Sequence, residues 1–264
     1  METVADQARV GPISRLEMEI PTESAPPSRA THQASPEARN CPTVGAARQD
    51  GGMHRRFTGW PTSAYDVLLE LDGDPPLAVR ERCRSDREQL VRAPMIALLQ
   101  DLADADLSYD DFTVEGFVSP YYGRWQHQLA RIRIARNVTI DLAFDLDGLH
   151  LSGLWWPAAP EVLQRYRTAV AGESSGADLS EILRRLEADG RRITGDVMKR
   201  MPRGHAADHP RADLLGHRSL TVELPLGCED WLHTPDVVDH VLAASAELRP
   251  FTSWFTTHVV VTPG

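Results

Sequence analysis

The chain of 264 residues is poor in cysteine and lysine and has no long apolar run. Cys41, Cys83 and Cys228 are far apart and form no CxxC pair, which argues against a zinc ribbon and a secreted disulfide framework. Apolar stretches stay below the roughly 18 residues of a membrane span, so we expect no membrane partner. The N-terminus lacks a basic segment followed by an apolar core, so we expect a cytoplasmic protein without a secretory signal.

The cationic residues are almost all arginines. Among the 28 cationic residues, Lys199 is the single lysine. A GC-rich genome explains this, and so does a need for the bidentate anion recognition that arginine provides. The formal net charge is −10 and nucleic-acid binders are usually basic, so we expect no nucleic-acid partner.

The motifs of several large enzyme classes are missing as well. The sequence has no GxGxxG after a strand, no GxxxxGK[ST], no GxSxG and no HExxH. It therefore identifies no cofactor, no metal site and no reaction type.

Aromatic residues are absent from residues 1–52, which hold six of the 19 prolines. Such a segment buries too little apolar surface to offset the entropy of ordering. We therefore expect a disordered tail over residues 1–52, followed by a single domain over residues 53–264.

The first two thirds of this domain change from helical to alternating spacing. Helices are predicted over 62–71 and 75–90, with a kink or restart at Pro94. Alternation from Phe112 to Gly153 predicts antiparallel strands, and Asp147-Gly148 predicts a type I′ hairpin turn with positive φ at both residues.

Helical spacing returns in the last third. Helices are expected over 160–172, from Asp178 or Ser180 to Gly190, and from Thr234-Pro235-Asp236 to about Leu248. A polar loop over 199–217 and a strand over 219–226 lie between them. The sequence thus predicts an α+β fold, in which an antiparallel β-meander is packed by helices from the N-terminal and C-terminal thirds.

Residues 199–219 are the densest polar segment. Asp208 and His209 are the catalytic candidates, because Pro210 holds His209 in an extended conformation and the acid is expected to be partly buried and hydrogen-bonded. The candidate ligand-binding residues of this segment are Arg203, His205, Arg211, His217 and Arg218. Three interpretations stay open: a metal site, an anion site with a histidine acid or base, and a loop tied down by hydrogen bonds.

An aromatic group is the second candidate. Trp155 and Trp156 are neighbours on a predicted strand, so we expect one to be buried and the other not. A tryptophan beside arginine or histidine can form the floor of a ligand pocket. The alternative is that one tryptophan packs in the core and the other lies at the sheet edge. Tyr121, Tyr122 and Trp125 precede the same strands.

Several segments together resemble one family. They are Arg56-Phe57-Thr58-Gly59-Trp60-Pro61, Val91-Arg92-Ala93-Pro94-Met95, residues 198–204, Asp208-His209-Pro210 and residues 214–220. In this order they are similar to the domain of unknown function 2461 family. The resemblance implies a stand-alone α+β protein of a kind common in bacteria, with no established activity.

The sequence departs from that family in one place. Members carry an R-D-x-R-F-S-x-D-K-x-P-Y stretch, and residues 117–126 here lack its charged pairs. The R-G-x-x-x-D-H-P segment from Arg203 to Pro210 is intact, so the resemblance implies that a retained function centres there.

Two functional hypotheses follow. The first is an enzyme or binder of a small, anionic molecule, with its site between the sheet, Trp155 or Trp156, and the 203–218 loop. The second is a non-catalytic interaction or structural module. The first requires Arg203, His209 and an aromatic in one pocket, and the second requires an exposed apolar patch. We favour the first, because dense buried charge is costly unless it is used.

Overall fold

The computed structural model describes residues 55–116, 125–206 and 208–260. The predicted disordered tail and most of the segment that departs from the family pattern lie outside these ranges. The described residues all belong to the unit Gly52–Gly264.

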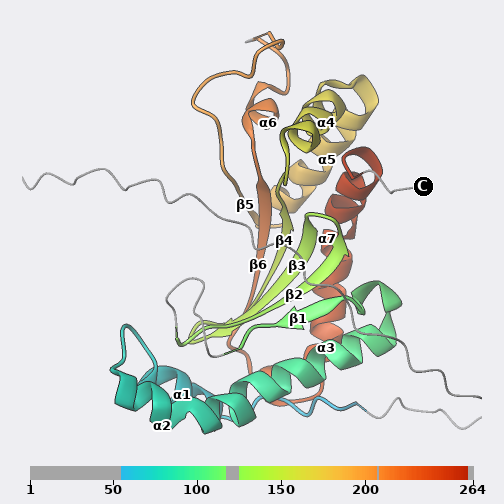
Figure 1. The fold of residues 1–264 in the computed structure, drawn as a ribbon. Helices are drawn as coiled ribbons and strands as arrows, with labels where there is room; N and C mark the ends of the chain where they lie inside the picture. The colour runs from blue at the N-terminus through green and yellow to red at the C-terminus, as the bar shows by residue number, and fades with distance from the viewer. Residues whose placement is uncertain (1–54, 117–124, 207, 261–264) are drawn as a thin grey trace, which may run out of the picture. The chain divides into compact units, whose positions relative to one another are not determined.

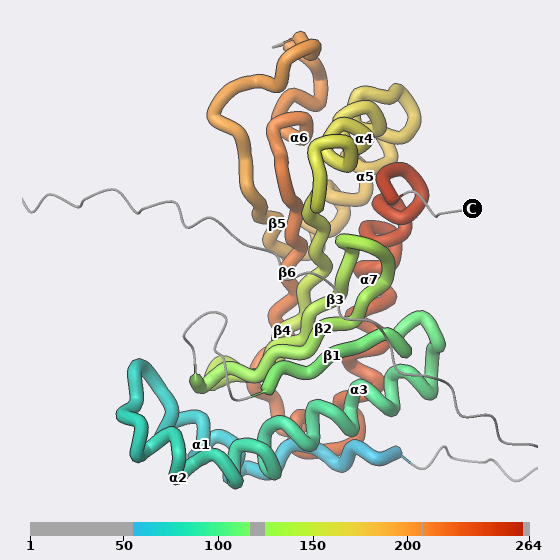
Figure 2. Tube along the Cα trace, viewed as in Figure 1, coloured from blue at the N-terminus to red at the C-terminus, as the bar shows by residue number. Residues whose placement is uncertain are grey.

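A six-stranded antiparallel sheet forms the centre of this unit, in the order β1-β2-β3-β4-β6-β5 (Figure 1). Its strands are β1 (Phe112–Val114), β2 (Gln128–Ala135), β3 (Val138–Asp145), β4 (Gly148–Trp155), β5 (Arg192–Thr194) and β6 (Leu220–Gly227). The first four run back and forth beside one another, as the trace in Figure 2 shows, so the predicted meander is confirmed. The short edge strand β5 was not predicted.

Helices from the two ends of the domain pack on this sheet (Figure 1). The N-terminal group is α1 (Ser63–Glu70), α2 (Leu77–Arg87), the π-helix η1 (Glu88–Arg92), α3 (Ala93–Ala105) and the 3-10 turn η2 (Leu107–Tyr109). The C-terminal group is α4 (Pro160–Ala171), α5 (Glu173–Ala188), α6 (Ala212–Gly216), the 3-10 turn η3 (Asp230–His233) and α7 (Val237–His258). This confirms the predicted α+β class. Among the helices of the described ranges, none combines the length and the apolar character that a bilayer crossing needs.

One face of the sheet is apolar and carries the core. Alternate residues of β3 and β4 are buried there, and α7 packs against both strands. The ring of Phe144 stacks on Trp60 at 4.3 Å, and that of Trp155 stacks on Phe255 of α7 at 4.7 Å. Because strand residues alternate, the positions between them point to the opposite face, which is polar.

The β3–β4 hairpin has a different turn from the predicted one. Asp145 pairs with Gly148, so Leu146-Asp147 is the loop. Gly148 has a φ of 101° while Asp147 does not have a positive φ, which corrects the predicted type I′ turn. A turn followed by one glycine with positive φ is another common way to close a hairpin.

Helix lengths also differ from the prediction. α5 begins at Glu173, earlier than Asp178 or Ser180, and α7 continues to His258 instead of ending near Leu248. Pro250 lies inside α7 and removes one helical N–H donor. Phe251 and Phe255 are fully buried beyond it, and their burial outweighs that loss. The predicted polar loop contains the short helix α6.

The segment before α1 is fixed by a buried carboxylate. Asp101 of α3 accepts hydrogen bonds from the backbone N–H groups of Arg56 and Phe57, at 3.0 and 2.9 Å. Gly59 has a φ of 103°, and a Cβ there would lie 2.1 Å from the carbonyl carbon of His233. The family-like Arg56–Pro61 segment therefore has a structural role: it anchors the N-terminal helices to the C-terminal third.

Candidate functional site

The polar face of the sheet holds charged and hydroxyl side chains from five strands. They are Arg131 (β2), Asp141 and Asp145 (β3), His150 and Ser152 (β4), Arg192 (β5), and Thr221 and Glu223 (β6). The strand registers place them side by side: Asp141 lies opposite Ser152, and Ser152 lies opposite Glu223. This arrangement follows from the alternation that buries their neighbours on the other face.

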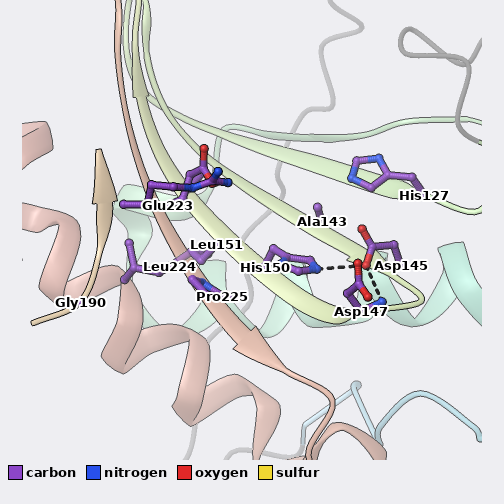
Figure 3. Close-up of a pocket in the computed structure, with 12 residues that line it drawn as sticks. His127, Ala143, Asp145, Asp147, His150, Leu151, Gly190, Glu223, Leu224 and Pro225 are labelled. Carbon is purple, nitrogen blue, oxygen red and sulfur yellow. Dashed lines mark hydrogen bonds and ion pairs between the residues drawn. The ribbon is translucent and has the colours of Figure 1, made fainter. Parts of the chain in front are cut away.

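One part of this face is hollowed into a pocket of about 430 Å³, which we call the His150 pocket (Figure 3). It is lined by His127, Ala143, Asp145, Asp147, His150, Leu151, Ser152, Gly190, Arg192, Glu223, Leu224 and Pro225. Figure 3 shows the His150 ring directed at Asp145, with Nε2 of His150 3.0 Å from Oδ1 of Asp145. The hairpin sets this geometry, because the two residues flank its turn on the same face.

The surroundings of this pair shift both pKa values. The hydrogen bond to Asp145 raises the pKa of His150, although burial opposes the shift. Burial raises the pKa of Asp145, but the hydrogen bonds from His150 and from the backbone N–H of Asp147 outweigh it, so the pKa lies below its ordinary value. The pair is thus held as an imidazolium and a carboxylate over a wider pH range than either group alone.

A second ion pair lies in the His150 pocket. Arg192 forms an ion pair with Glu223, and the hydroxyl of Thr194 donates to the same carboxylate at 3.2 Å. His127 lies close enough to Asp145 to lower its pKa further. Within the described ranges, no three His, Cys, Asp or Glu side chains are grouped so that they could hold a metal ion. The pocket thus presents the His150–Asp145 pair and the Arg192–Glu223 pair as hydrogen-bonding groups.

A second hollow on the same face, of about 470 Å³, is the Trp156 pocket. It is lined by Glu115, Arg131, Leu154, Trp155, Trp156, Ser219 and Thr221. The guanidinium of Arg131 lies 5.5 Å from the centre of the half-exposed Trp156 ring. Arg131 donates to both oxygens of Asp141, at 2.9 and 2.6 Å, and the Thr139 hydroxyl also donates to that carboxylate. These bonds fix the guanidinium in one orientation beside the indole.

Glu115 contributes a carboxyl group to the Trp156 pocket. Its backbone N–H donates to the carbonyl of Leu129, and its own carbonyl accepts from Arg92 and Gln128. Burial raises the pKa of Glu115, with Arg131 opposing the shift. The Glu115 side chain lines this pocket beside Arg131.

The predicted loop residues divide into different environments. Arg211 is half-buried and donates to the carbonyls of Val170, Ala171 and Gly172, at 2.7 to 3.2 Å. The carbonyls of Val170 and Ala171 belong to the last turn of α4, where a helix offers no backbone N–H partner, and the carbonyl of Gly172 also accepts from the N–H of Gly176. Gly176 leaves room for the guanidinium, since a Cβ there would lie 2.4 Å from its Nε. Arg211 is thus a capping residue for α4.

The two catalytic candidates lie close to each other in the loop but differ from the expectation. Asp208 is exposed, which contradicts its predicted partial burial. Nδ1 of His209 accepts a hydrogen bond from the backbone N–H of Arg211 at 3.0 Å, so one imidazole nitrogen is used within the loop. The ring of His205 lies 6.5 Å from that of His209. These contacts fit a tied-down loop.

The remaining loop candidates are also engaged locally or exposed. Arg218 pairs with Asp196 at 2.6 Å, and Nδ1 of His217 lies 3.1 Å from the carbonyl of Ser219. Arg203 is exposed, and it does not line the Trp156 pocket. Ligand binding by these side chains stays a prediction.

The tryptophan pair follows the alternation expected of it. Trp155 is 1% exposed and packs between Tyr166 and Phe255 in the core, whereas Trp156 is half-exposed. Trp156 therefore lines its pocket with its ring accessible. Tyr121 and Tyr122 lie outside the described residues.

Sequence reasoning missed His150, Asp145, Arg131 and Asp141 as site residues. Their signal was present, because each is a polar residue at an alternate position of a predicted strand. The missing step was the register, which decides that these positions meet across neighbouring strands.

The fold and these pockets define an α+β protein whose antiparallel sheet has one buried face and one hydrogen-bonding face. A family model described as a conserved hypothetical protein (DUF2461) matches residues 142–254, from β3 to α7. This confirms the resemblance over that range, which includes Asp145, His150 and Glu223. Neither the search of curated proteins nor the search of solved structures gave a match.

Proposed function

We propose that this protein binds a small polar molecule in the His150 pocket and that His150 exchanges a proton with the bound molecule. The observation that carries the proposal is the half-buried His150–Asp145 pair, at 3.0 Å, on the wall of a 430 Å³ pocket. A histidine oriented by a carboxylate is a common acid–base device, and a pocket of this size suits a small ligand.

The charge balance of the site favours a neutral ligand over the anionic one expected from the loop. Arg192 and Arg131 each already face a carboxylate, and Asp147 adds a negative charge to the His150 pocket. In the loop, Arg211 caps α4 and Arg218 pairs with Asp196. An anion would therefore have to compete with partners that are already in place.

The alternative, an interaction module, has less support. The strongly exposed large apolar residues in the described ranges are Leu69, Leu77, Leu107 and Val197. They lie on α1, on α2, on η2 and in the segment after β5. Single exposed apolar residues are normal on a protein surface.

The test is a thermal-shift screen of the full chain with neutral, anionic and cationic metabolites, followed by NMR titration of the histidine rings. A ligand of the His150 pocket raises the melting temperature and shifts the ring resonances of His150. His150→Gln abolishes the response, while His240→Gln, at an exposed position of α7, keeps it. Ligands that act equally on both variants, or a screen without any response at His150, would refute the proposal.

A further inference from the structure

The two pockets on the polar face are immediate neighbours along two strands. Ser152 of the His150 pocket and Leu154 of the Trp156 pocket are two residues apart on β4. Their partners on β6, Glu223 and Thr221, belong to the same two pockets. Two strand residues span about 6.6 Å, so one molecule of modest length can reach both.

Three pairs of opposite charges in contact lie at the two pockets. Arg131 with Asp141, Arg192 with Glu223, and His150 with Asp145 each combine donors and acceptors while carrying little net charge. Ligand hydroxyl groups suit such pairs, because each hydroxyl donates one hydrogen bond and accepts others. The hydroxyls of Ser152, Ser219 and Thr221 supply further partners of the same kind.

The Trp156 pocket adds a flat apolar surface to this polar set. Trp156 is half-exposed, and Leu154 lies beside it in the lining. A sugar ring has one face of C–H groups and a rim of hydroxyls, so it packs on an indole while its hydroxyls reach the surrounding polar groups. Aromatic rings with a few placed polar groups are the general composition of small-ligand sites.

We propose that the ligand is a neutral carbohydrate that occupies both pockets, with one sugar ring on Trp156 and the next beside His150. The proposal rests on the proposed function, since it names the class of molecule bound in the His150 pocket. Glu115 is an additional acceptor at the Trp156 end, and burial favours its uncharged form, which also suits a neutral ligand.

The experiment is an NMR titration of the full chain with a panel of neutral monosaccharides and disaccharides as probes. Glucosamine and glucose 6-phosphate serve as cationic and anionic comparisons. The indole N–H of Trp156, identified by its loss in Trp156→Leu, and the His150 ring report on the two ends of the site. We expect at least one neutral disaccharide to shift both signals and to bind about tenfold more tightly than its component monosaccharide.

Two variants separate a ligand contact from a general effect. Trp156→Leu should remove the tenfold advantage of the disaccharide and leave the monosaccharide response at His150 intact. Trp231→Leu, at a half-buried tryptophan that stacks on His240, should leave both unchanged.

The outcomes distinguish the two proposals. A charged compound that shifts His150 when every neutral sugar fails would overturn the carbohydrate inference and leave the proposed function standing. A disaccharide that shifts the His150 signal but binds Trp156→Leu as tightly as wild type would also overturn the carbohydrate inference. The proposed function would still stand in that case. If no sugar and no screened metabolite shifts the His150 signal, both the carbohydrate inference and the proposed function are overturned.

Discussion

Replacing Gly148 with alanine tests how tightly the hairpin next to the His150 pocket is packed. Gly148 has a φ of 101° and follows Asp147, which lines that pocket. A Cβ at this position would lie 2.1 Å from the carbonyl oxygen of Gly227 and 2.4 Å from its carbonyl carbon. Both neighbours are backbone atoms of the end of β6, so no side-chain rotation can relieve the contact.

The expected loss has two parts. A left-handed backbone conformation destabilises an L-residue by about 1–2 kcal/mol. Because alanine restricts the unfolded chain more than glycine does, it offsets about 0.4–1 kcal/mol of this loss. Pushing β6 away from β4 adds the cost of overpacking, about 1–3 kcal/mol. We therefore expect Gly148→Ala to lower the free energy of unfolding by about 2–4 kcal/mol, a large part of the roughly 5–15 kcal/mol of a typical domain.

Gly227 supplies a matched control across the same contact. Its φ is 82°, but a Cβ there would meet no atom within 4 Å. Gly227→Ala therefore carries the backbone cost alone, about 1 kcal/mol. Urea denaturation of both variants gives the comparison. Equal losses would show that β4 and β6 do not approach each other as closely as the structure has them.

Three further predictions concern the pocket and the loop. Asp145→Asn should lower the pKa of His150 in an NMR titration, because the hydrogen bond that raises it is lost. The raised pKa of His150 stabilises the fold below the pKa of histidine in the unfolded chain, about 6.5. This stabilisation is lost as pH rises through the pKa of His150 in the folded protein. The difference in the free energy of unfolding between wild type and Asp145→Asn should therefore narrow toward alkaline pH. Arg211→Met should lower the free energy of unfolding by about 2–4 kcal/mol, because the carbonyls of Val170 and Ala171 lose their partner. The exposed Arg203→Met should change it by no more than about 0.5 kcal/mol, and reversed denaturation midpoints would contradict the capping role. His209→Ala should lower the free energy of unfolding by about 1 kcal/mol, because the hydrogen bond from the N–H of Arg211 is lost. Thermal shifts induced by ligands should stay unchanged, and their loss would show that the ligand binds in the 199–219 loop.

Much of the fold could be predicted because its signals are local. The alternation through β3 and β4 and the Asp147-Gly148 dipeptide place a hairpin correctly, although the turn itself is shifted by one residue. The end of α7 could not be predicted locally, because Pro250 usually ends or kinks a helix. Contacts of Phe251 and Phe255 with the distant sheet decide that the helix continues, and these contacts exist only in the folded chain.

The candidate site was harder to predict because it depends on strand order. Arg131 and Asp141 are ten residues apart, yet the β2–β3 register places them directly opposite each other. Glu223 reaches His150's neighbourhood only because β6 inserts between β4 and β5. Composition drew attention to the 199–219 loop instead, since its charges are adjacent in the sequence.

The hydrogen-bond partners of the polar side chains distinguish the 199–219 loop from the polar face of the sheet. The side chain of Arg211 is directed at backbone carbonyls, and Nδ1 of His209 is bonded to a backbone N–H. Groups bonded in this way satisfy the chain's own main-chain atoms, because a loop without regular structure must find partners for them elsewhere. On the polar face of the sheet, the ladder already satisfies the backbone, so the side chains there bond to one another. Such pairs can rearrange toward a ligand without unfolding any segment, and for this reason the polar face is the stronger candidate for binding.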